Sequence, residues 1–245
     1  MGLFGSIGSK SKVKAANKKV AAAREKDDIA QAEKLFSEAM GIYESIASDS
    51  SAFKDALYNW GVALLYSARL KQGDEAKALY EEAGKKFSYC LVAKADYLAA
   101  AIDWGVALME LAALQGETEK ETSYAMAKEK FSLADSIQKG VVSYNFACLH
   151  AVHGDFDACK EALELARDYK NLPDEEEILN DADMQITKTQ AWFDDFIVSI
   201  NAPESDEKTE DDGDDGDEEV IAEAQYSKTK VHTDGYKVEY DKKEK

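Results

Sequence analysis

A short block that pairs a large aromatic residue with a very small one occurs three times in this chain. The copies are YNWGVAL at 58–64, IDWGVAL at 102–108 and YNFACL at 144–149. Their small residues, Gly61, Gly105 and Ala147, are 44 and 42 residues apart. A nearly fixed period in this range, within helix-forming sequence, indicates an array of helical repeats. We expect the small residue to let a second helix approach closely, and the aromatic beside it to fill the groove that this approach creates.

A second pattern of small, large and small residues, spaced by four and then three, follows each block. Its copies are Ala76/Tyr80/Ala83, Ala127/Phe131/Ala134 and Cys159/Leu163/Ala166, and Ala32/Phe36/Ala39 precedes the first block. On a helix this spacing puts the three residues on one face, which we expect to dock on the glycine of the first helix. Together, the two patterns resemble the tetratricopeptide repeat (TPR) family, whose unit is a helix–turn–helix.

The resemblance covers residues 27–170 and implies an all-α fold, a right-handed solenoid of helix–turn–helix units. We predict units at about 11–48, 53–94, 95–138 and 141–170. The absence of proline from residue 10 to residue 172, together with many helix-forming residues, predicts helix in the same region. A further amphipathic helix over 174–200 is predicted to cap the solenoid, because the last repeat must cover its apolar face.

The last 45 residues have a different composition. Residues 202–219 contain eleven acidic residues and one lysine. Such a segment repels itself and cannot bury enough apolar surface to fold, so we predict a disordered acidic tail at 201–245. Near its end, residues 226–240 alternate weakly around Asp234-Gly235, a dipeptide typical of hairpin turns. A lone hairpin is only marginally stable in water, so this end is interpreted as a docking peptide or as tail.

The N-terminus carries the opposite charge, with seven Lys/Arg and one Glu in residues 1–26. We predict a flexible, glycine-rich basic head at 1–10, and three interpretations of it remain open. Gly2 with Ser6 fits the N-myristoylation pattern, and the lysines that follow supply the second signal that stable anchoring needs. Alternatively, the apolar residues and lysines form a helix on an anionic membrane surface, or the segment is a frayed terminus. The candidate lipidation and membrane residues are Gly2, Leu3, Phe4, Lys10, Lys12, Lys14, Lys18 and Lys19.

Charge and hydropathy exclude other classes of protein. The net charge is −19, and the helical body that follows the basic residues 1–26 has no basic stripe, which argues against nucleic-acid binding by the body. No apolar run is long enough for a membrane span, and no signal-peptide core is present. The three cysteines, Cys90, Cys148 and Cys159, contain no CxxC pair and are interpreted as buried free thiols in a reducing compartment. We therefore expect a cytoplasmic protein, with peripheral attachment to a membrane as an open possibility.

The only metal-ligating residue types that cluster in the sequence are Cys148, His150, His153 and Cys159. A closed zinc site needs four converging ligands, whereas on a helix the two histidines share a face that the cysteines do not. We therefore predict no metal, no cofactor and no catalytic residue. An enzyme with a site in the groove is the least favoured function.

In the TPR family, the first helix of each repeat lines a concave groove that holds a peptide or a partner helix. By this resemblance, the residues that precede the small-aromatic pair become candidate ligand contacts. The candidate partner-binding residues are Tyr58, Asn59, Val62, Ile102, Asp103, Val106, Tyr144 and Asn145. An amide both donates and accepts, so it can satisfy a peptide backbone; the alternative is that these side chains are exposed and contact nothing. The groove lacks the Lys/Arg that members binding acidic C-termini need, so an apolar, tyrosine-rich segment or helix is the expected ligand.

These features predict a non-catalytic scaffold or adaptor that binds a protein partner and sits at an anionic membrane surface, with no nucleic acid involved. The main alternative is a self-associating structural or coat protein that uses its repeat ends, groove or tail.

Overall fold

The computed structural model describes residues 3–200, with side chains from residue 8 onward, and every element in this range is helical. The prediction of an all-α fold is therefore confirmed. The predicted acidic tail at 201–245 and Gly2 lie outside the described residues. The elements are α1 (Leu3–Arg24), α2 (Ile29–Glu44), α3 (Phe53–Ala68), α4 (Gly73–Ala93), α5 (Leu98–Ala112), α6 (Glu117–Ile137), α7 (Ser143–Val152), α8 (Phe156–Asp168), α9 (Glu175–Asn180), the 3-10 helix η1 (Gln185–Thr189) and α10 (Phe193–Ile200).

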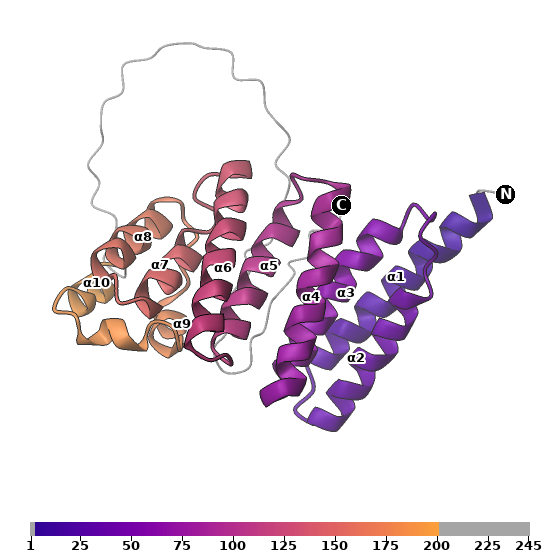
Figure 1. Ribbon diagram of the computed structural model, residues 1–245, viewed down its shortest axis with the longest axis horizontal. Helices are drawn as coiled ribbons and strands as arrows, with labels where there is room; N and C mark the ends of the chain where they lie inside the picture. Colours follow the sequence, from indigo (N-terminus) through magenta and orange to yellow (C-terminus); the bar gives the residue numbers. More distant parts are fainter. Residues whose placement is uncertain (1–2, 201–245) are drawn as a thin grey trace, which may run out of the picture. The chain divides into compact units, whose positions relative to one another are not determined.

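The described residues divide into two compact units, with the boundary between Leu172 and Pro173. In the first unit, α1 to α8 follow one another side by side (Figure 1), and each helix contacts the next. The helices pair as α1–α2, α3–α4, α5–α6 and α7–α8, and the first helices of the first three pairs also touch, α1 with α3 and α3 with α5. None of the described helices combines the length and the apolar character needed to cross a membrane.

A glycine-to-ring contact closes the second and third helix pairs. A Cβ placed on Gly61 of α3 would lie 2.6 Å from Cε1 of Phe87 in α4. A Cβ placed on Gly105 of α5 would lie 2.3 Å from Cε1 of Phe131 in α6. In both pairs the ring follows the glycine by 26 residues, so the geometry recurs with the 44-residue period of the sequence. The aromatic ring occupies the place of a side chain, which lets the two helices approach closely.

The α1–α2 pair uses a hydrogen bond at the same position. Asn17 and Tyr43 are also 26 residues apart, and each precedes its counterpart in the next pair by 44 residues. The Tyr43 hydroxyl donates to Asn17 Oδ1 over 2.6 Å, and the ring is buried. The first pair is therefore a variant of the same unit, with a polar contact where the next two pairs have glycine.

The predicted docking face of α4 is seven residues, or about two helical turns, out of register. We predicted that Ala76/Tyr80/Ala83 meets Gly61, but the ring against that glycine is Phe87. The trio that corresponds to Ala127/Phe131/Ala134 at the 44-residue period is Ala83/Phe87/Cys90, all fully buried. The error arose because one face of α4 is buried from Ala76 to Cys90, so two overlapping trios on that face fit the small-large-small pattern.

The tryptophans beside the glycines lie against lysines of the second helices. The Lys86 ammonium lies 4.0 Å from the ring centroid of Trp60, and the Lys130 ammonium lies 4.5 Å from that of Trp104. A Cβ on Gly84 of α4 would lie 2.9 Å from Nε1 of Trp104. Trp104 thus fills space between α5 and the preceding helix, with a cation–π contact on its ring.

Two predicted boundaries differ from the structure. Helix α1 begins at Leu3, so residues 3–10 are helical and do not form the predicted flexible head. Val13, Ala16, Val20 and Ala23 give this helix a continuous buried face. Once such a face nucleates a helix, extending it toward the N-terminus adds one hydrogen bond for each residue fixed, and no proline stops it.

The predicted single helix over 174–200 is also wrong, because the structure has two short α-helices and a 3-10 helix there. Asp174 and Glu177 form a capping box that starts α9. Asp181 then accepts a hydrogen bond from the N–H of Asp183 over 2.9 Å, and its extended backbone ends the helix. Aspartate competes in this way with helical hydrogen bonding. The role of 174–200 as a cap stays a prediction.

The close contact at Gly105 predicts that two glycine-to-alanine substitutions in helix interiors change the free energy of unfolding in opposite directions. Gly105→Ala should destabilise the protein by about 1–3 kcal/mol, because the new methyl group overlaps the Phe131 ring. Gly41→Ala, with nothing within 4 Å, should stabilise it by about 0.5–1 kcal/mol through backbone entropy. Urea unfolding followed by circular dichroism measures both. Equal effects of the two substitutions would contradict the role of the glycine-to-ring contact.

Candidate partner-binding surface

Two of the predicted partner-binding residues meet in the structure. The hydroxyl of Tyr58, in α3, donates to Oδ2 of Asp103, in α5, over 2.8 Å. The ring of Tyr58 also lies 5.2 Å, centroid to centroid, from the ring of Tyr97, which precedes α5. These contacts join the first helices of two successive pairs.

The other predicted residues divide between the surface and the core. Ile102 and Val106 of α5 are half-buried, as is Asn145 of α7. Val62 and Tyr144 are only 4% and 7% exposed, so they belong to the core and offer a ligand little surface. The reason for Val62 is that α3 is buried on all sides from Gly61 to Ala68, a run that the repeat pattern alone did not reveal.

Asn59 is half-buried and uses its amide within its own helix. Its Nδ2 donates to the carbonyl oxygen of Asp55, one turn earlier, over 2.7 Å. The amide oxygen and the second N–H are not part of this bond. Asn59 therefore has less capacity to bind a peptide backbone than its position in the repeat suggested.

Burial makes Asp103 an unusual carboxyl group. It raises the pKa of Asp103 from the ordinary 3.8 to about 6, although the Tyr58 hydrogen bond and the nearby Arg69 act in the opposite direction. The carboxylate of Glu110 adds to the rise. Asp103 is therefore ionised at pH 7 at a free-energy cost, which the hydrogen bond from Tyr58 partly offsets.

A set of residues that the sequence did not single out surrounds Asp103. The Arg69 guanidinium of α3 binds Glu110 of α5 through both carboxylate oxygens, with Nε at 3.1 and 3.0 Å and Nη2 at 2.5 Å. These two side chains are only 9% and 14% exposed. The guanidinium carbons of Arg69 and Arg24 lie 4.7 and 4.5 Å from the ring centroid of Tyr66. Because Arg24 ends α1, these contacts connect the first helices of three pairs.

We call Arg24, Tyr66, Arg69, Asp103 and Glu110 the inter-helix cluster. It contains two guanidinium groups and two carboxyl groups, and burial raises the pKa of Tyr66. A bidentate arginine–carboxylate pair fixes geometry as well as adding energy. The sequence did carry a signal for the cluster, since only three arginines occur in this lysine-rich chain and two of them meet here.

A second candidate site lies around the turn that connects α6 to α7. A pocket of about 220 Å³ is lined by Asp135, Lys139, Gly140, Ser143, Phe146, His150, Ala158, Glu161, Ala162, Leu165 and Tyr169. Leu165 and Tyr169 are 49% and 46% exposed, which is high for apolar or aromatic side chains of this size. The pocket therefore combines an exposed apolar rim with a few ionisable groups.

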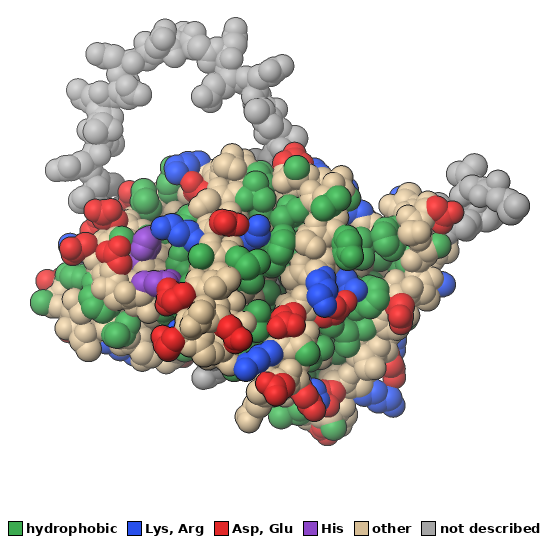
Figure 2. Space-filling view, in the orientation of Figure 1, with side chains coloured by type: hydrophobic (Ala, Val, Ile, Leu, Met, Phe, Trp, Pro, Cys, Tyr) green, Lys and Arg blue, Asp and Glu red, His purple; other side chains and the backbone are tan. Residues whose placement is uncertain are grey.

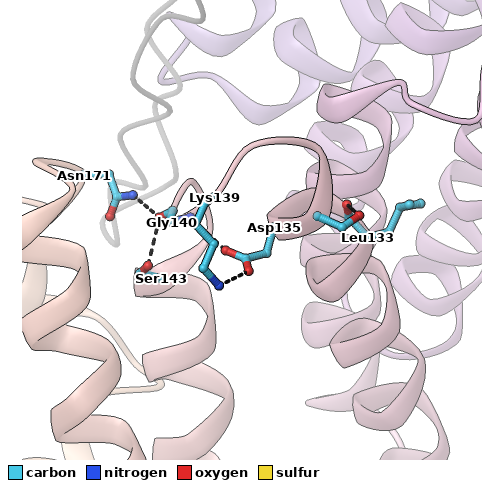
Figure 3. Close-up of polar contacts among 7 residues, drawn as sticks. Leu133, Asp135, Lys139, Gly140, Ser143 and Asn171 are labelled. Carbon is cyan, nitrogen blue, oxygen red and sulfur yellow. Dashed lines mark hydrogen bonds and ion pairs between the residues drawn. The ribbon is translucent and has the colours of Figure 1, made fainter. Parts of the chain in front are cut away.

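The turn at Gly140 is held by a small polar network (Figure 3). Gly140 has φ +80, and its N–H donates to Asp135 Oδ1 over 2.8 Å, while Lys139 Nζ pairs with Asp135 Oδ2 over 2.7 Å. The carbonyl oxygen of Gly140 accepts hydrogen bonds from Ser143 Oγ over 2.9 Å and from Asn171 Nδ2. Burial alone would raise the pKa of Asp135, but the bonds from Lys139 and Gly140 hold it below its ordinary value. The network keeps one wall of the pocket fixed.

The cysteines and histidines of the third block make separate contacts. Cys148 and Cys159 are buried and form no disulfide with a described residue, and burial raises the pKa of Cys159 to about 12. His153 Nδ1 lies 2.7 Å from the carbonyl oxygen of Leu149, and His150 Nδ1 lies 3.8 Å from Asp155 Oδ2. A thiol with so high a pKa is a weak nucleophile at neutral pH.

Comparison of the chain with family models, curated proteins and solved structures finds no match. Its function is therefore inferred from its own residues.

The raised pKa of Asp103 predicts a pH-dependent difference in stability. The folded protein holds the Asp103 proton up to pH 6, and the unfolded chain releases it near pH 4, so Asp103 favours folding more as the pH falls from 7 to 4. Asp103→Asn keeps an acceptor for Tyr58 without the buried charge. The variant should be more stable than the wild type by about 2 kcal/mol at pH 7, and this difference should shrink toward pH 4.

Thermal melts of the two proteins across this pH range measure the difference. Asp96→Asn, which removes a carboxylate that is 71% exposed, controls for the change in net charge. A stability difference between wild type and Asp103→Asn that is independent of pH would contradict the burial of an ionised Asp103.

Proposed function

We propose that this chain is a TPR-like solenoid that serves as a non-catalytic scaffold and binds a protein partner along its first helices. The observation that carries the proposal is the recurrence of one interhelical contact, at Asn17–Tyr43, Gly61–Phe87 and Gly105–Phe131, with a 44-residue period. Each of the first three helix pairs is thus one copy of the same supersecondary unit. In repeat arrays of this kind, equivalent helices line an extended surface on which partners bind.

The inter-helix cluster supports this role by fixing the first helices relative to one another. The Arg69–Glu110 pair and the Tyr58–Asp103 bond both connect α3 to α5. A surface that is held in place before binding loses less conformational entropy when the partner arrives. The half-buried Ile102 and Val106 on α5 supply apolar contact beside the cluster, which suits a peptide or helix with apolar and tyrosine side chains.

We further propose that the protein works in the cytoplasm, at the surface of a membrane that it reaches through its N-terminal residues. The lysines of α1 support this proposal, and the sequence adds the acylation pattern at Gly2 as a second membrane signal. The side chains of Leu3 and Phe4 are outside the described part of the structure.

The groove proposal predicts that charge placed on α5 abolishes partner capture. Val106→Arg should reduce recovery of the specific partner from a native lysate at least tenfold, because a guanidinium replaces an apolar contact. Val92→Arg is the matched control: Val92 is 86% exposed, lies on α4 and is outside the groove. Quantitative mass spectrometry of affinity-purified wild type and both variants gives the comparison.

Circular dichroism melts must show that Val106→Arg remains folded, since Val106 is half-buried. Asn145→Arg, on α7, provides a second groove variant if it does not. Recovery of the same partner in the same amount with folded groove variants would overturn the proposal.

A second candidate function, self-association into a structural assembly, is favoured by the exposed apolar rim of the α6–α7 pocket. Leu165 and Tyr169 are the rim residues, and apolar side chains this exposed are typical of contact surfaces. If the wild type forms oligomers, Leu165→Lys with Tyr169→Lys should return it to a monomer in sedimentation velocity. A wild type that is monomeric at high concentration would exclude this candidate.

A further inference from the structure

Helix α1 is strongly basic in a strongly acidic chain. Its residues Leu3–Arg24 include five lysines and one arginine and no acidic residue, whereas the net charge of the whole chain is −19. By contrast, the molecular face shown in Figure 2 intermixes acidic and basic side chains, without a large area of one sign. The charge of α1 is therefore a local feature that the face shown in Figure 2 does not repeat.

The five lysines of α1 fall into two groups. Lys19 forms an ion pair with Glu38 of α2 at 2.5 Å, and Lys12 Nζ donates to Ser45 Oγ over 3.3 Å. Lys10, Lys14 and Lys18 are exposed, and they form no ion pair or hydrogen bond with any described residue. Several lysines of other helices differ from this second group, since each pairs with an acid three or four residues away: Lys77, Lys85, Lys86, Lys139 and Lys160.

We call Lys10, Lys14 and Lys18 the lysine stripe. Successive members are four residues apart, which puts them on one side of the helix over a length of about 12 Å. The opposite side of α1 is buried in the first unit through Val13, Ala16, Val20 and Ala23. The stripe therefore points away from the core.

The surface around the stripe is smooth. The exposed residues next to the lysines are Ser11, Ala15, Ala21 and Ala22, which are all small. No acidic side chain competes for the lysines within the helix. A flat plane of negative charge can approach such a helix closely, and the flexible lysine side chains can follow it.

We propose that the lysine stripe is the face by which the protein lies on an anionic lipid bilayer, with α1 along the membrane surface. The proposal deepens the membrane association in the proposed function and does not depend on the groove. Lysines near an anionic surface each add to the binding free energy. A site for a defined phosphate group favours the bidentate fork of arginine, and the lysine stripe contains no arginine.

The position of the stripe in the sequence favours a bilayer over an acidic protein. Leu3 and Ile7 precede Lys10 in the same continuous helix, at intervals of four and three residues. A helix that combines apolar residues with lysines is typical of interfacial binding. The acidic residues at 204–219 are a competing occupant from the same chain, which the salt and vesicle tests below distinguish from lipid.

The test uses the full, unacylated chain with a tag at its C-terminus. Wild type should sediment with vesicles that contain phosphatidylserine, but not with pure phosphatidylcholine vesicles, and added salt should release it. Lys10→Gln, Lys14→Gln and Lys18→Gln together should lower the partition coefficient roughly 100-fold. Glutamine keeps the helix propensity of lysine, so circular dichroism should be unchanged.

Two control variants separate the stripe from charge in general. Lys12→Gln with Lys19→Gln leaves the stripe intact and should bind nearly as the wild type does. Lys77→Gln, Lys85→Gln and Lys160→Gln change the net charge by the same amount as the stripe variant, on α4 and α8, and should also bind normally.

Each other outcome overturns a defined part of the proposal. The assignment to this face is wrong if the stripe variant binds vesicles as the wild type does, or if the remote triple variant loses as much vesicle binding as the stripe variant. In either case the proposal of membrane association itself still stands. If the wild type binds no vesicle, but binds once residues 202–245 are deleted, the tail is the occupant of the stripe in the full chain and the bilayer is not. If neither binds, membrane association through α1 is wrong as well. The partner-capture experiment with Val106→Arg tests the groove proposal independently of each of these outcomes.

Discussion

The close approach of two helices at a glycine is the contact on which the first unit depends. At Gly61 and Gly105, an aromatic ring from the second helix occupies the place where any other residue would have its Cβ. A ring in that place brings the helix axes together and leaves the flanking tryptophan to fill the space toward the neighbouring helix. Because the contact recurs every 44 residues, the same solution is applied to successive pairs. The Asn17–Tyr43 hydrogen bond shows that a polar contact can substitute where a larger residue is present.

Apolar packing of this kind fixes each pair but leaves the first helices of neighbouring pairs with few contacts. The inter-helix cluster supplies what is missing. Arg69 and Glu110 form a nearly buried bidentate pair, and Asp103 is kept ionised at a cost beside them. Replacing such groups by apolar residues is often neutral or stabilising for the fold alone. Their presence is therefore better explained by a requirement to hold α1, α3 and α5 in fixed positions relative to one another than by stability.

The fold class and the helix pairs could be predicted from the sequence, because a repeated pattern states the same geometry several times. Register was harder: Ala76/Tyr80/Ala83 and Ala83/Phe87/Cys90 both satisfy the spacing, and only tertiary contact selects the second. The prediction of a single helix over 174–200 was wrong because it relied on the spacing of apolar residues. It did not consider that the Asp181 side chain accepts a hydrogen bond from a backbone N–H and so helps to end the helix. Tyr58 and Asp103 were both predicted as candidate site residues, but the hydrogen bond between them was not. A hydrogen bond between residues 45 apart in the sequence has no local signature. The small number of arginines was a sequence signal for the inter-helix cluster that the prediction did not use.

Helix α1 connects the two proposed activities mechanically. Its inner face belongs to the core through Val13, Ala16 and Val20, its outer face carries the lysine stripe, and Arg24 at its end lies on the ring of Tyr66. A helix that is rigidly packed on one side cannot rotate to suit a membrane, so contact through the stripe would set the direction of the helices that pack on it. The guanidinium at its C-terminus then lies in the same cluster that holds α3 and α5. Membrane contact and partner contact would thus be made by different residues of the same helical unit, and binding at the bilayer would orient the groove that is connected to α1 through the inter-helix cluster.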